Sequence, residues 1–302
     1  MGRRKHGLDI HGIVLLDKPA GISSNRALQK VRGIYGARKA GHTGSLDPFA
    51  TGMLPICLGE ASKTAAFMLE AGKRYRATAR LGVATTTGDV EGEVIKTCPL
   101  PDIDPGKLAL ALKPFEGQIE QVPPMYSALK HEGKPLYEYA RAGIVIERPS
   151  RPVTIHRLEA LEWQPPDLKF EVHCSKGTYI RTLAEDIATA LGSCAHLVAL
   201  RRTLVEPFDD FPMHTLAQLQ DALECGDLQN LLLPVDAGLP DWQRIELNSI
   251  QQGKFRHGNA FEFVQTGLMA GMVRVCGPEG DLLGLADLTP DGVLKPAKVF
   301  NL

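Results

Sequence analysis

Hydrophobic and polar positions alternate, or recur at regular spacing, along most of the chain, and the spacing predicts the elements. Residues 13–16 are a short apolar run that ends at the Lys18-Pro19 turn, which is typical of a buried strand. Ser23, Ser24 or Asn25 can then cap a helix over about 25–35. Residues 75–81 alternate strictly, so we expect a half-buried strand with Tyr75 at the end of its apolar face.

Similar patterns predict the other elements of the first 245 residues. Arg181 falls in the first turn of a helix that starts near residue 180 and that Gly192 closes. We expect an apolar run over 53–58, a strand over 168–174, and helices over 60–69, 107–113, 180–191 and from residue 215.

From residue 247 on, the pattern changes to short apolar segments separated by glycines, which predicts a small β-barrel or sandwich of about 55 residues. A chain of 302 residues can bury one large core and a smaller appended one. We therefore expect a mixed α/β (α+β) protein with one domain over 1–245 and a second over 246–302.

Residues 125–151 form a separate feature in which tyrosines and bases are interleaved around a short helix. This composition suits a lid, or thumb, that grips RNA through phosphate contacts and stacking. The alternative is a surface helical hairpin whose tyrosines pack on the core. The residues concerned are Tyr126, Lys130, Lys134, Tyr137, Tyr139, Arg141, Arg148 and Arg151.

Composition is that of an ordinary globular protein, with 44% hydrophobic and 23% charged residues. No apolar run approaches the ~20 residues of a membrane span, and no signal-type apolar segment follows the basic N-terminus, so we expect a cytoplasmic protein. The six cysteines lie at least 20 residues apart, without a C-x-x-C pair. We expect buried or inert thiols, no disulfide framework and no zinc.

Charge is unevenly distributed, although the net charge is only −1. Residues 1–80 contain 14 Lys and Arg against 5 Asp and Glu, a net of +9, so residues 81–302 contain 20 against 30, a net of −10. Because nucleic-acid affinity follows local clusters of bases, the N-terminal part permits RNA binding; a solvated face is the alternative. Residues 203–243 hold eight acids and no Lys or Arg, so we do not expect them to face phosphates.

Residues 41–52 (GHTGSLDPFATG) present one carboxylate in a glycine-bounded turn between two apolar segments. The glycines permit backbone angles that other residues avoid, and Pro48 favours an extended Asp47. We expect the Asp47 side chain to point away from its loop as a reactive acid, although Asp-Pro pairs are also ordinary turn residues. The loop lacks the G-x-x-x-x-G-K-[ST] pattern of a P-loop.

The same run resembles, residue for residue, the catalytic loop G-H-x-G-x-L-D-P-x-A-x-G of the TruB family of pseudouridine synthases. Residues 12–21 (GIVLLDKPAG), 73–76 (KRYR) and 174–183 (CSKGTYIRTL) are similar to other motifs of that family, in the same order. One departure is Thr86, where family members commonly have Asp. The resemblance implies a catalytic domain with a central, largely antiparallel sheet flanked by helices, and a PUA-like C-terminal module.

The resemblance also implies roles for individual residues. Asp47 would be the catalytic acid, Arg181 the cation that keeps it ionised, and Tyr75 the ring that stacks on the extracted uracil. Taken alone, Arg181 would be a helix-surface arginine and Tyr75 a core residue. The reaction consumes nothing, so neither cofactor nor metal is implied. The expected substrate-binding residues are His42, Lys18, Tyr179 and Leu200.

The implied activity is isomerisation of uridine 55 to pseudouridine in the T loop of tRNA, after the base is flipped out. Three routes are open to Asp47: attack on carbon 6 of uracil, attack on the sugar carbon, or removal of a sugar proton. The chain lacks the extended basic tails of the guide-RNA-dependent relatives, so we expect a stand-alone monomer that binds the T stem-loop and no guide RNA. The alternative is a tRNA-folding chaperone with a vestigial catalytic loop.

Overall fold

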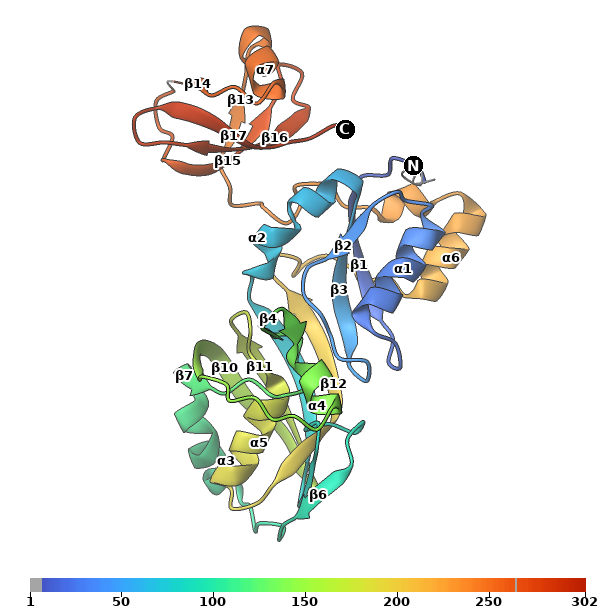
Figure 1. Cartoon of the computed structure of the whole chain (residues 1–302), viewed down its shortest axis with the longest axis vertical. Helices are drawn as coiled ribbons and strands as arrows, with labels where there is room; N and C mark the ends of the chain where they lie inside the picture. Colours follow the sequence, from blue (N-terminus) through green and yellow to red (C-terminus); the bar gives the residue numbers. More distant parts are fainter. Residues whose placement is uncertain (1–6, 264) are drawn as a thin grey trace.

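The computed structural model describes residues 7–263 and 265–302, and its main layer is a sheet of eight strands (Figure 1). Seven strands lie in the order β1-β3-β12-β4-β11-β10-β7, and β2 pairs with β3. Neighbours are antiparallel except β12 and β3. The expected central, largely antiparallel sheet is therefore confirmed. Its strands are β1 (Gly12–Lys18), β2 (Ala40–His42), β3 (Thr51–Leu58), β4 (Lys73–Leu81), β7 (Gly117–Gln121), β10 (Arg151–Gln164), β11 (Asp167–Cys174) and β12 (Ala195–Val205).

Helices pack on the sheet in two groups (Figure 1). α1 (Ser24–Ile34) and α6 (Leu216–Cys225) lie together beside β1 and β3, whereas α3 (Pro105–Leu112) and α5 (Ile180–Ala190) lie near β10, β4 and β12. Side chains of Ser23, Asp104 and Thr215 cap α1, α3 and α6 by accepting hydrogen bonds from backbone amides. The four helices expected at these positions are confirmed.

The prediction of one continuous helix over 60–69 is wrong, because the segment is divided at Thr64 into two shorter pieces. A 3-10 turn, η1 (Gly59–Lys63), precedes a short α2 (Ala65–Leu69). The buried Thr64 hydroxyl donates to the carbonyl oxygens of Ala61 at 2.8 Å and Val235 at 3.3 Å. A contact with a residue so distant in sequence has no signature in the local periodicity.

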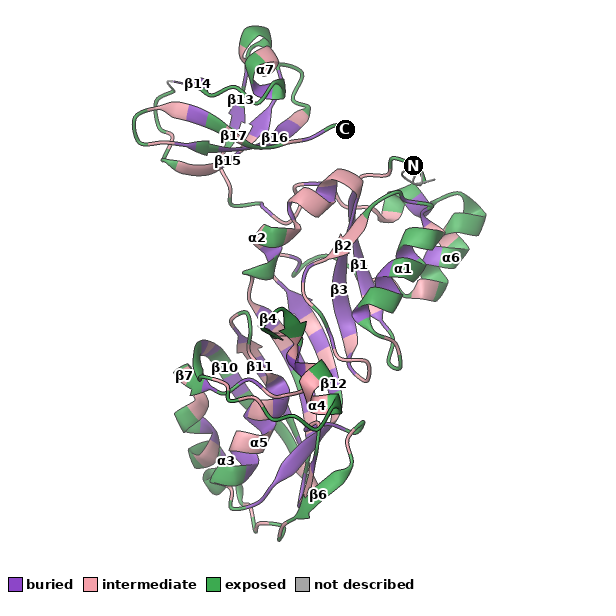
Figure 2. Ribbon diagram, viewed as in Figure 1, coloured by how far each residue is buried: buried purple, intermediate pink, exposed green. Residues whose placement is uncertain are grey.

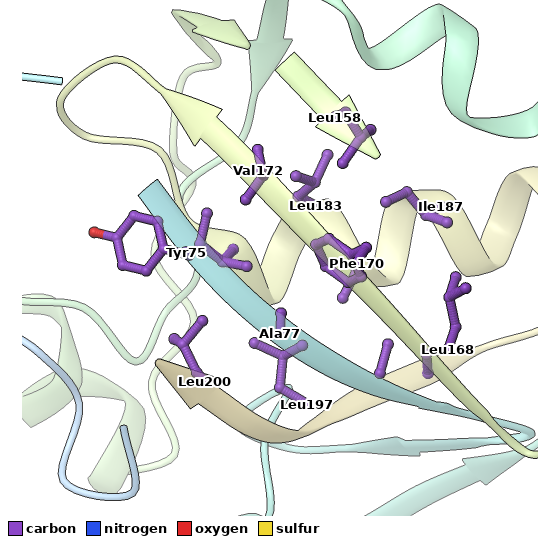
Figure 3. Close-up of a cluster of buried hydrophobic side chains, with 14 of the residues drawn as sticks. Tyr75, Ala77, Leu158, Leu168, Phe170, Val172, Leu183, Ile187, Leu197 and Leu200 are labelled. Atoms are coloured by element: carbon purple, nitrogen blue, oxygen red, sulfur yellow. The ribbon is translucent and has the colours of Figure 1, made fainter. Parts of the chain in front are cut away.

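The main core lies between the inner face of the sheet and α5. Tyr75, Ala77, Ala79 and Leu81 are buried on one face of β4, as the alternation predicted, and Figure 2 shows the buried residues concentrated in the strands. Figure 3 shows Tyr75 at the end of this cluster, with its hydroxyl group directed away from the aliphatic side chains. The core therefore positions Tyr75 at its own edge.

A disulfide joins Cys98 to Cys194, which corrects the expectation of free thiols at these positions. The hairpin of β5 (Val83–Thr85) and β6 (Val94–Thr97) returns the chain to the start of β12. Gly82 donates its backbone N–H to Cys194 and accepts one from Cys98, both at 2.8 Å. The pairing was not predictable from spacing, because 96 residues separate the two cysteines.

Residues 125–151 contain the expected short helix, α4 (Leu136–Arg141), after a small hairpin of β8 (Lys130–His131) and β9 (Lys134–Pro135). Beyond α6, the 3-10 turn η3 (Leu228–Leu231) leads toward the C-terminal part. A further 3-10 turn, η2 (Lys113–Phe115), joins α3 to β7. No helix among the described residues is long and apolar enough to cross a membrane.

The C-terminal part is a second sheet with its own core, at one end of the elongated molecule (Figure 1). It contacts the rest through Phe300, which shares a core with Met53 and Phe208. Lys63 Nζ also donates to the Val299 carbonyl at 2.7 Å. A half-barrel of this kind agrees with a PUA-like module. Its elements are β13 (Arg244–Glu246), α7 (Ser249–Arg256), β14 (Phe261–Glu262), β15 (Gly271–Cys276), β16 (Leu282–Leu288) and β17 (Val293–Val299).

Candidate active site

The loop between β2 and β3 carries Asp47 and is fixed at both ends. Leu46 is buried, and its backbone N–H and C=O bond the Ser24 hydroxyl at 2.8 and 3.0 Å. Gly52 has φ of +101°, and a side chain there would collide with the Arg202 backbone. This glycine lets β3 approach β12 where the two strands pair. The loop therefore holds the Asp47 carboxylate in a fixed position.

Lys18 supports this loop from beneath. Its side chain is fully buried, and Nζ donates to the carbonyl oxygens of Pro19, Ile22 and Pro48 at 2.9, 2.7 and 3.2 Å. Burial lowers the pKa of Lys18 to about 8, while the Asp47 carboxylate opposes this shift. The amine thus holds the residue that follows Asp47, and Lys18 is not among the residues that line the cavity described below, so its expected substrate contact stays a prediction.

Asp47 forms an ion pair with Arg181, as the resemblance implied. Arg181 Nε lies 3.0 Å from Asp47 Oδ2, and Arg181 Nη2 lies 3.3 Å from Oδ1. The Arg181 side chain is 5% exposed and that of Asp47 36% exposed, so the ion pair has one buried partner and one partly exposed partner. The Nη2–Oδ1 hydrogen bond and the Nε–Oδ2 ion-pair contact together fix the orientation of the carboxylate as well as its charge.

Opposing effects set the pKa of Asp47. Burial raises the pKa above its usual value, whereas the Arg181 guanidinium lowers it. The nearby Asp89 carboxylate adds to the rise, and Lys18 opposes it. Arg181 is thus the strongest influence that keeps the Asp47 carboxyl ionised in a poorly hydrated site.

Arg181 is itself held by backbone oxygens from two distant segments. Nη1 donates to the Thr87 carbonyl and Nη2 to the Tyr126 carbonyl, both at 2.7 Å. Asp89, which is 2% exposed, places Oδ2 3.6 Å from Nη1. Sequence patterns gave no role to Asp89. Thr86, the one departure noted above, is exposed and caps the hairpin by accepting the Glu93 N–H at 3.1 Å.

A cavity of about 320 Å³ opens beside Asp47. Pockets of ~300–1,000 Å³ are the usual size for small ligands. The cavity brings together five of the residues singled out from the sequence, whereas His42 and Lys18 are not among its lining. Those five are Asp47, Tyr75, Tyr179, Arg181 and Leu200.

The two tyrosines form walls of this cavity. Gln121 clamps the Tyr179 backbone by accepting its N–H at 2.7 Å and donating to its C=O at 3.0 Å. Burial raises the pKa of both phenols, so each is protonated at neutral pH. With Leu200 they give the space above the carboxylate aromatic and apolar sides.

Family comparisons account for almost the whole chain. Residues 32–180 match the TruB family pseudouridylate synthase (N terminal domain), residues 181–240 the tRNA pseudouridylate synthase B C-terminal domain, and residues 244–300 the Pseudouridine synthase II TruB, C-terminal domain. The chain is 52% identical over 300 residues to tRNA pseudouridine synthase B of Nitrosococcus oceani, covering 99% of this chain and 97% of that protein. The chain belongs to the TruB family.

A second TruB relative, tRNA pseudouridine synthase B of Mannheimia succiniciproducens, is 49% identical over 302 residues and is covered to 99%, like this chain. Among solved structures, a chain of a Cbf5-Nop10-Gar1 complex superposes with a TM-score of 0.74 at 27% identity, over 96% of this chain and 85% of that one. A chain of an H/ACA RNP bound to a substrate RNA containing 2'-deoxyuridine, at 24% identity, also has a TM-score of 0.74, over 100% and 92% of the two chains. The TruB chain thus shares its fold with these proteins.

His42 lies at the end of β2, where the loop that carries Asp47 begins in this TruB protein. The ring is half-buried, and its Nδ1 has no hydrogen-bond partner among the described residues. Burial lowers the pKa of His42, and the Arg202 guanidinium lowers it further. His42 is therefore neutral at pH 7, with an unused polar atom.

Arg202 and Lys73 line the cavity, although sequence reasoning overlooked both. Arg202 is 1% exposed, and its guanidinium donates to the carbonyl oxygens of Met53 at 2.7 Å and Gly44 at 3.1 Å. One signal was present: Arg202 follows Leu200 and precedes Leu204 at period two, on the apolar face of a strand. An arginine at such a position needs acceptors from elsewhere in the fold.

Proposed function

We propose that this protein isomerises uridine to pseudouridine at position 55 in the T loop of tRNA, with Asp47 as nucleophile or base. The observation that carries the proposal is the Asp47–Arg181 ion pair on the wall of a cavity of about 320 Å³. Family membership supports the chemistry, and the relatives named tRNA pseudouridine synthase B support tRNA as the substrate.

The reaction needs little beyond this constellation. The bond between N1 of uracil and C1′ of ribose breaks, C5 bonds to C1′, the C5 proton leaves, and N1 gains a proton. No electrons are exchanged, so the chemistry requires no redox cofactor. An ionised Asp47, oriented by its hydrogen bond and ion pair with Arg181, supplies the reactive oxygen at the junction of sugar and base.

The cavity walls suit a detached base. We assign the stacking surface to Tyr75, because burial raises the pKa of its phenol and keeps it a neutral ring. Tyr179 and Leu200 close the other sides. His42, at the start of the loop, would occupy space near the flipped nucleotide and so help to keep the uracil base out of the RNA stack. Flipping costs a few kcal/mol, which stacking and phosphate contacts offset.

The architecture supports further parts of the proposal. We assign residues 1–245 to catalysis, residues 125–151 to an RNA-gripping lid, and residues 246–302 to a PUA-like RNA-binding module. Tyr126 of the lid accepts a hydrogen bond from Arg181, so lid position and catalytic geometry are coupled. We also propose a cytoplasmic monomer that acts without guide RNA.

Tritium release from tRNA labelled at C5 of uridine tests the activity. The wild-type protein should release tritium from tRNA that contains uridine 55, and not from tRNA with cytidine at that position. Asp47→Asn should abolish release while tRNA binding persists, because the substitution preserves size and removes only the charge. Undiminished release by Asp47→Asn would exclude the catalytic assignment, and wild-type binding without release would favour an RNA-folding role.

A further inference from the structure

The outer face of α1 carries three bases and no acid. Arg26 and Lys30 are exposed and lie four residues apart on one side of the helix, and exposed Arg32 lies in the last turn. Asn25 and Gln29 lie on the same exposed side. Figure 2 shows exposed residues along this helix. We call these five residues the α1 face.

The bases of the α1 face have no acidic partner, unlike others in the same basic segment. Arg76 lies 2.9 Å from Glu171, and Arg80 lies 2.8 Å from Asp167, so neighbouring strands neutralise both. Within residues 7–263 and 265–302, no ion pair involves a base of the α1 face. Part of the positive charge of residues 1–80 is therefore available to an external anion.

Arg26 occupies a position that helix stability disfavours. With Ser23 as N-cap, Arg26 is the third helical residue, where Glu or Gln completes a capping box and where the helix dipole attracts an acid. α6 and α7, by contrast, have Gln at this position and complete their capping boxes. A base that opposes a local preference, with no compensating contact, points to a role outside the fold.

The N-terminus of α1 is attached to the catalytic loop. Ser24, its first residue, forms two hydrogen bonds with the backbone of Leu46, the neighbour of Asp47. The lid contacts Asp47 from another side, through Arg181 and the Tyr126 carbonyl. The helix, ~16 Å long at 1.5 Å per residue, thus extends away from the catalytic loop as a basic track.

An acidic neighbour limits where this track can lead. α6 packs beside α1 and carries Asp221 and Glu224 but no base (Figure 1). Phosphates would be repelled there. A polyanion that follows α1 is therefore kept on the side away from α6 and near the catalytic loop.

We propose that the α1 face binds backbone phosphates of the substrate RNA outside the loop whose nucleotide enters the cavity. This inference rests on the proposed RNA substrate. Three exposed basic side chains and two side-chain amides suit sequence-independent contacts to phosphates, which position the RNA without reading its sequence. We infer a folded RNA larger than the isolated loop for two reasons. RNA carries the charge opposite to that of the α1 face, and α1 is hydrogen-bonded to the loop that carries Asp47, so an RNA whose nucleotide enters the cavity passes close to the helix.

The test compares Arg26→Gln/Lys30→Gln with a control of equal charge change. The control is Lys96→Gln/Lys113→Gln, two exposed lysines on β6 and η2 at the opposite end of the sheet. Dissociation constants for full-length tRNA and for the isolated T stem-loop are measured over a range of salt, in an Asp47→Asn background. Turnover at saturating tRNA is measured with Asp47 intact.

For full-length tRNA we expect the α1 variant to bind about tenfold more weakly, with a salt slope lower by about 2, one unit per lost phosphate contact. The control should change neither value, and kcat should stay at the wild-type level. An unchanged Kd and slope would overturn the proposal, as would an equal loss on the isolated stem-loop. Failure of the proposed function would differ, since the wild-type protein itself would then release no tritium.

Discussion

In the proposed function, the charge state of one side chain, Asp47, determines whether the site can act. Its carboxyl is pulled in two directions, because burial favours the neutral acid and Arg181 favours the carboxylate. Arg181 in turn depends on Thr87, Asp89 and Tyr126 for its position. Asp47 is thus one end of a series of polar contacts that continues through Arg181, and a pH profile of the matching variant can test each contact.

Arg181→Met should move the acid limb of kcat to higher pH. Activity requires the carboxylate and is lost as pH falls through the Asp47 pKa, which rises by ~1–3 units when an adjacent cation is removed. Arg181→Lys retains the charge, so its limb should stay near that of the wild type although kcat falls, because an ammonium group cannot reproduce the planar contacts of the guanidinium. Identical limbs in the two variants would contradict this electrostatic role.

Asp89→Asn should move the same limb in the opposite direction. The Asp89 carboxylate raises the pKa of Asp47, so its removal lowers that pKa, and the acid limb shifts down by ~1 unit or less. We also expect kcat to fall by about tenfold with KM unchanged, because a less firmly held Arg181 costs ~1.4 kcal/mol of transition-state stabilisation. Glu93→Gln, an exposed acid in the same hairpin, is the control. A rise in KM would argue for direct substrate contact.

Lys18→Met should destabilise the protein and lower kcat without raising KM. Removal of the amine leaves three carbonyl oxygens, those of Pro19, Ile22 and Pro48, without their donor, at a total cost of ~2–4 kcal/mol of unfolding free energy. Urea unfolding and steady-state kinetics measure the two effects, with exposed Lys39→Met as control. A selective rise in KM at unchanged stability would support the substrate contact expected from the sequence.

At the residue scale, the sequence predicts those features of the site that depend on neighbouring residues in the chain. Asp47 could be predicted because glycines and Pro48 mark an exposed acid within a few residues. The role of Asp89 could not, because its partner Arg181 lies on α5, far along the chain, and for Arg202 the strand pattern marked a buried arginine but not its acceptors. The burial of the Lys18 amine could not be predicted for a related reason, because the tertiary packing of the loop around it decides that burial.

At the scale of elements, the β5–β6 hairpin connects the Asp47–Arg181 site to the Cys98–Cys194 disulfide. Its turn supplies Thr87 and Asp89 to Arg181, and its base continues to Cys98, which is bonded to Cys194. Periodicity predicted β4, β11 and α5 correctly, since each buries one face within its own length. It failed at Thr64 and at the disulfide, where the decisive partner lies far along the chain.

Reduction of the Cys98–Cys194 bond should lower the free energy of unfolding by ~2–4 kcal/mol, because the reduced, unfolded chain gains conformational entropy. Urea unfolding with and without dithiothreitol measures the change, and Cys98→Ser/Cys194→Ser should not respond to the reductant. In denaturant, the oxidised chain should show only the four remaining thiols, Cys57, Cys174, Cys225 and Cys276. Six reactive thiols in the oxidised protein would contradict the pairing.

At the scale of the whole molecule, the C-terminal sheet contributes no residue to the cavity, but it packs on the rest of the protein through an apolar junction. All cavity-lining residues lie between Gly44 and Arg202, so the C-terminal sheet contributes none of them. Its Phe300, only 6% exposed, packs in a core with Met53 and Phe208, and Phe67 meets Trp242 edge to face at 4.8 Å. The module is thus held by contacts that leave the chemistry untouched.

Phe300→Ala should loosen this junction without changing kcat at saturating tRNA. Loss of a buried phenylalanine costs ~3–5 kcal/mol, and calorimetry should resolve two unfolding transitions if the module then melts apart from the body. Phe263→Ala is the matched control, because Phe263 is buried within the module's own core and should lower only the module's transition. Weaker tRNA binding at unchanged kcat would fit a module that holds RNA, whereas a loss of kcat in Phe300→Ala would mean that module position controls the distant carboxylate.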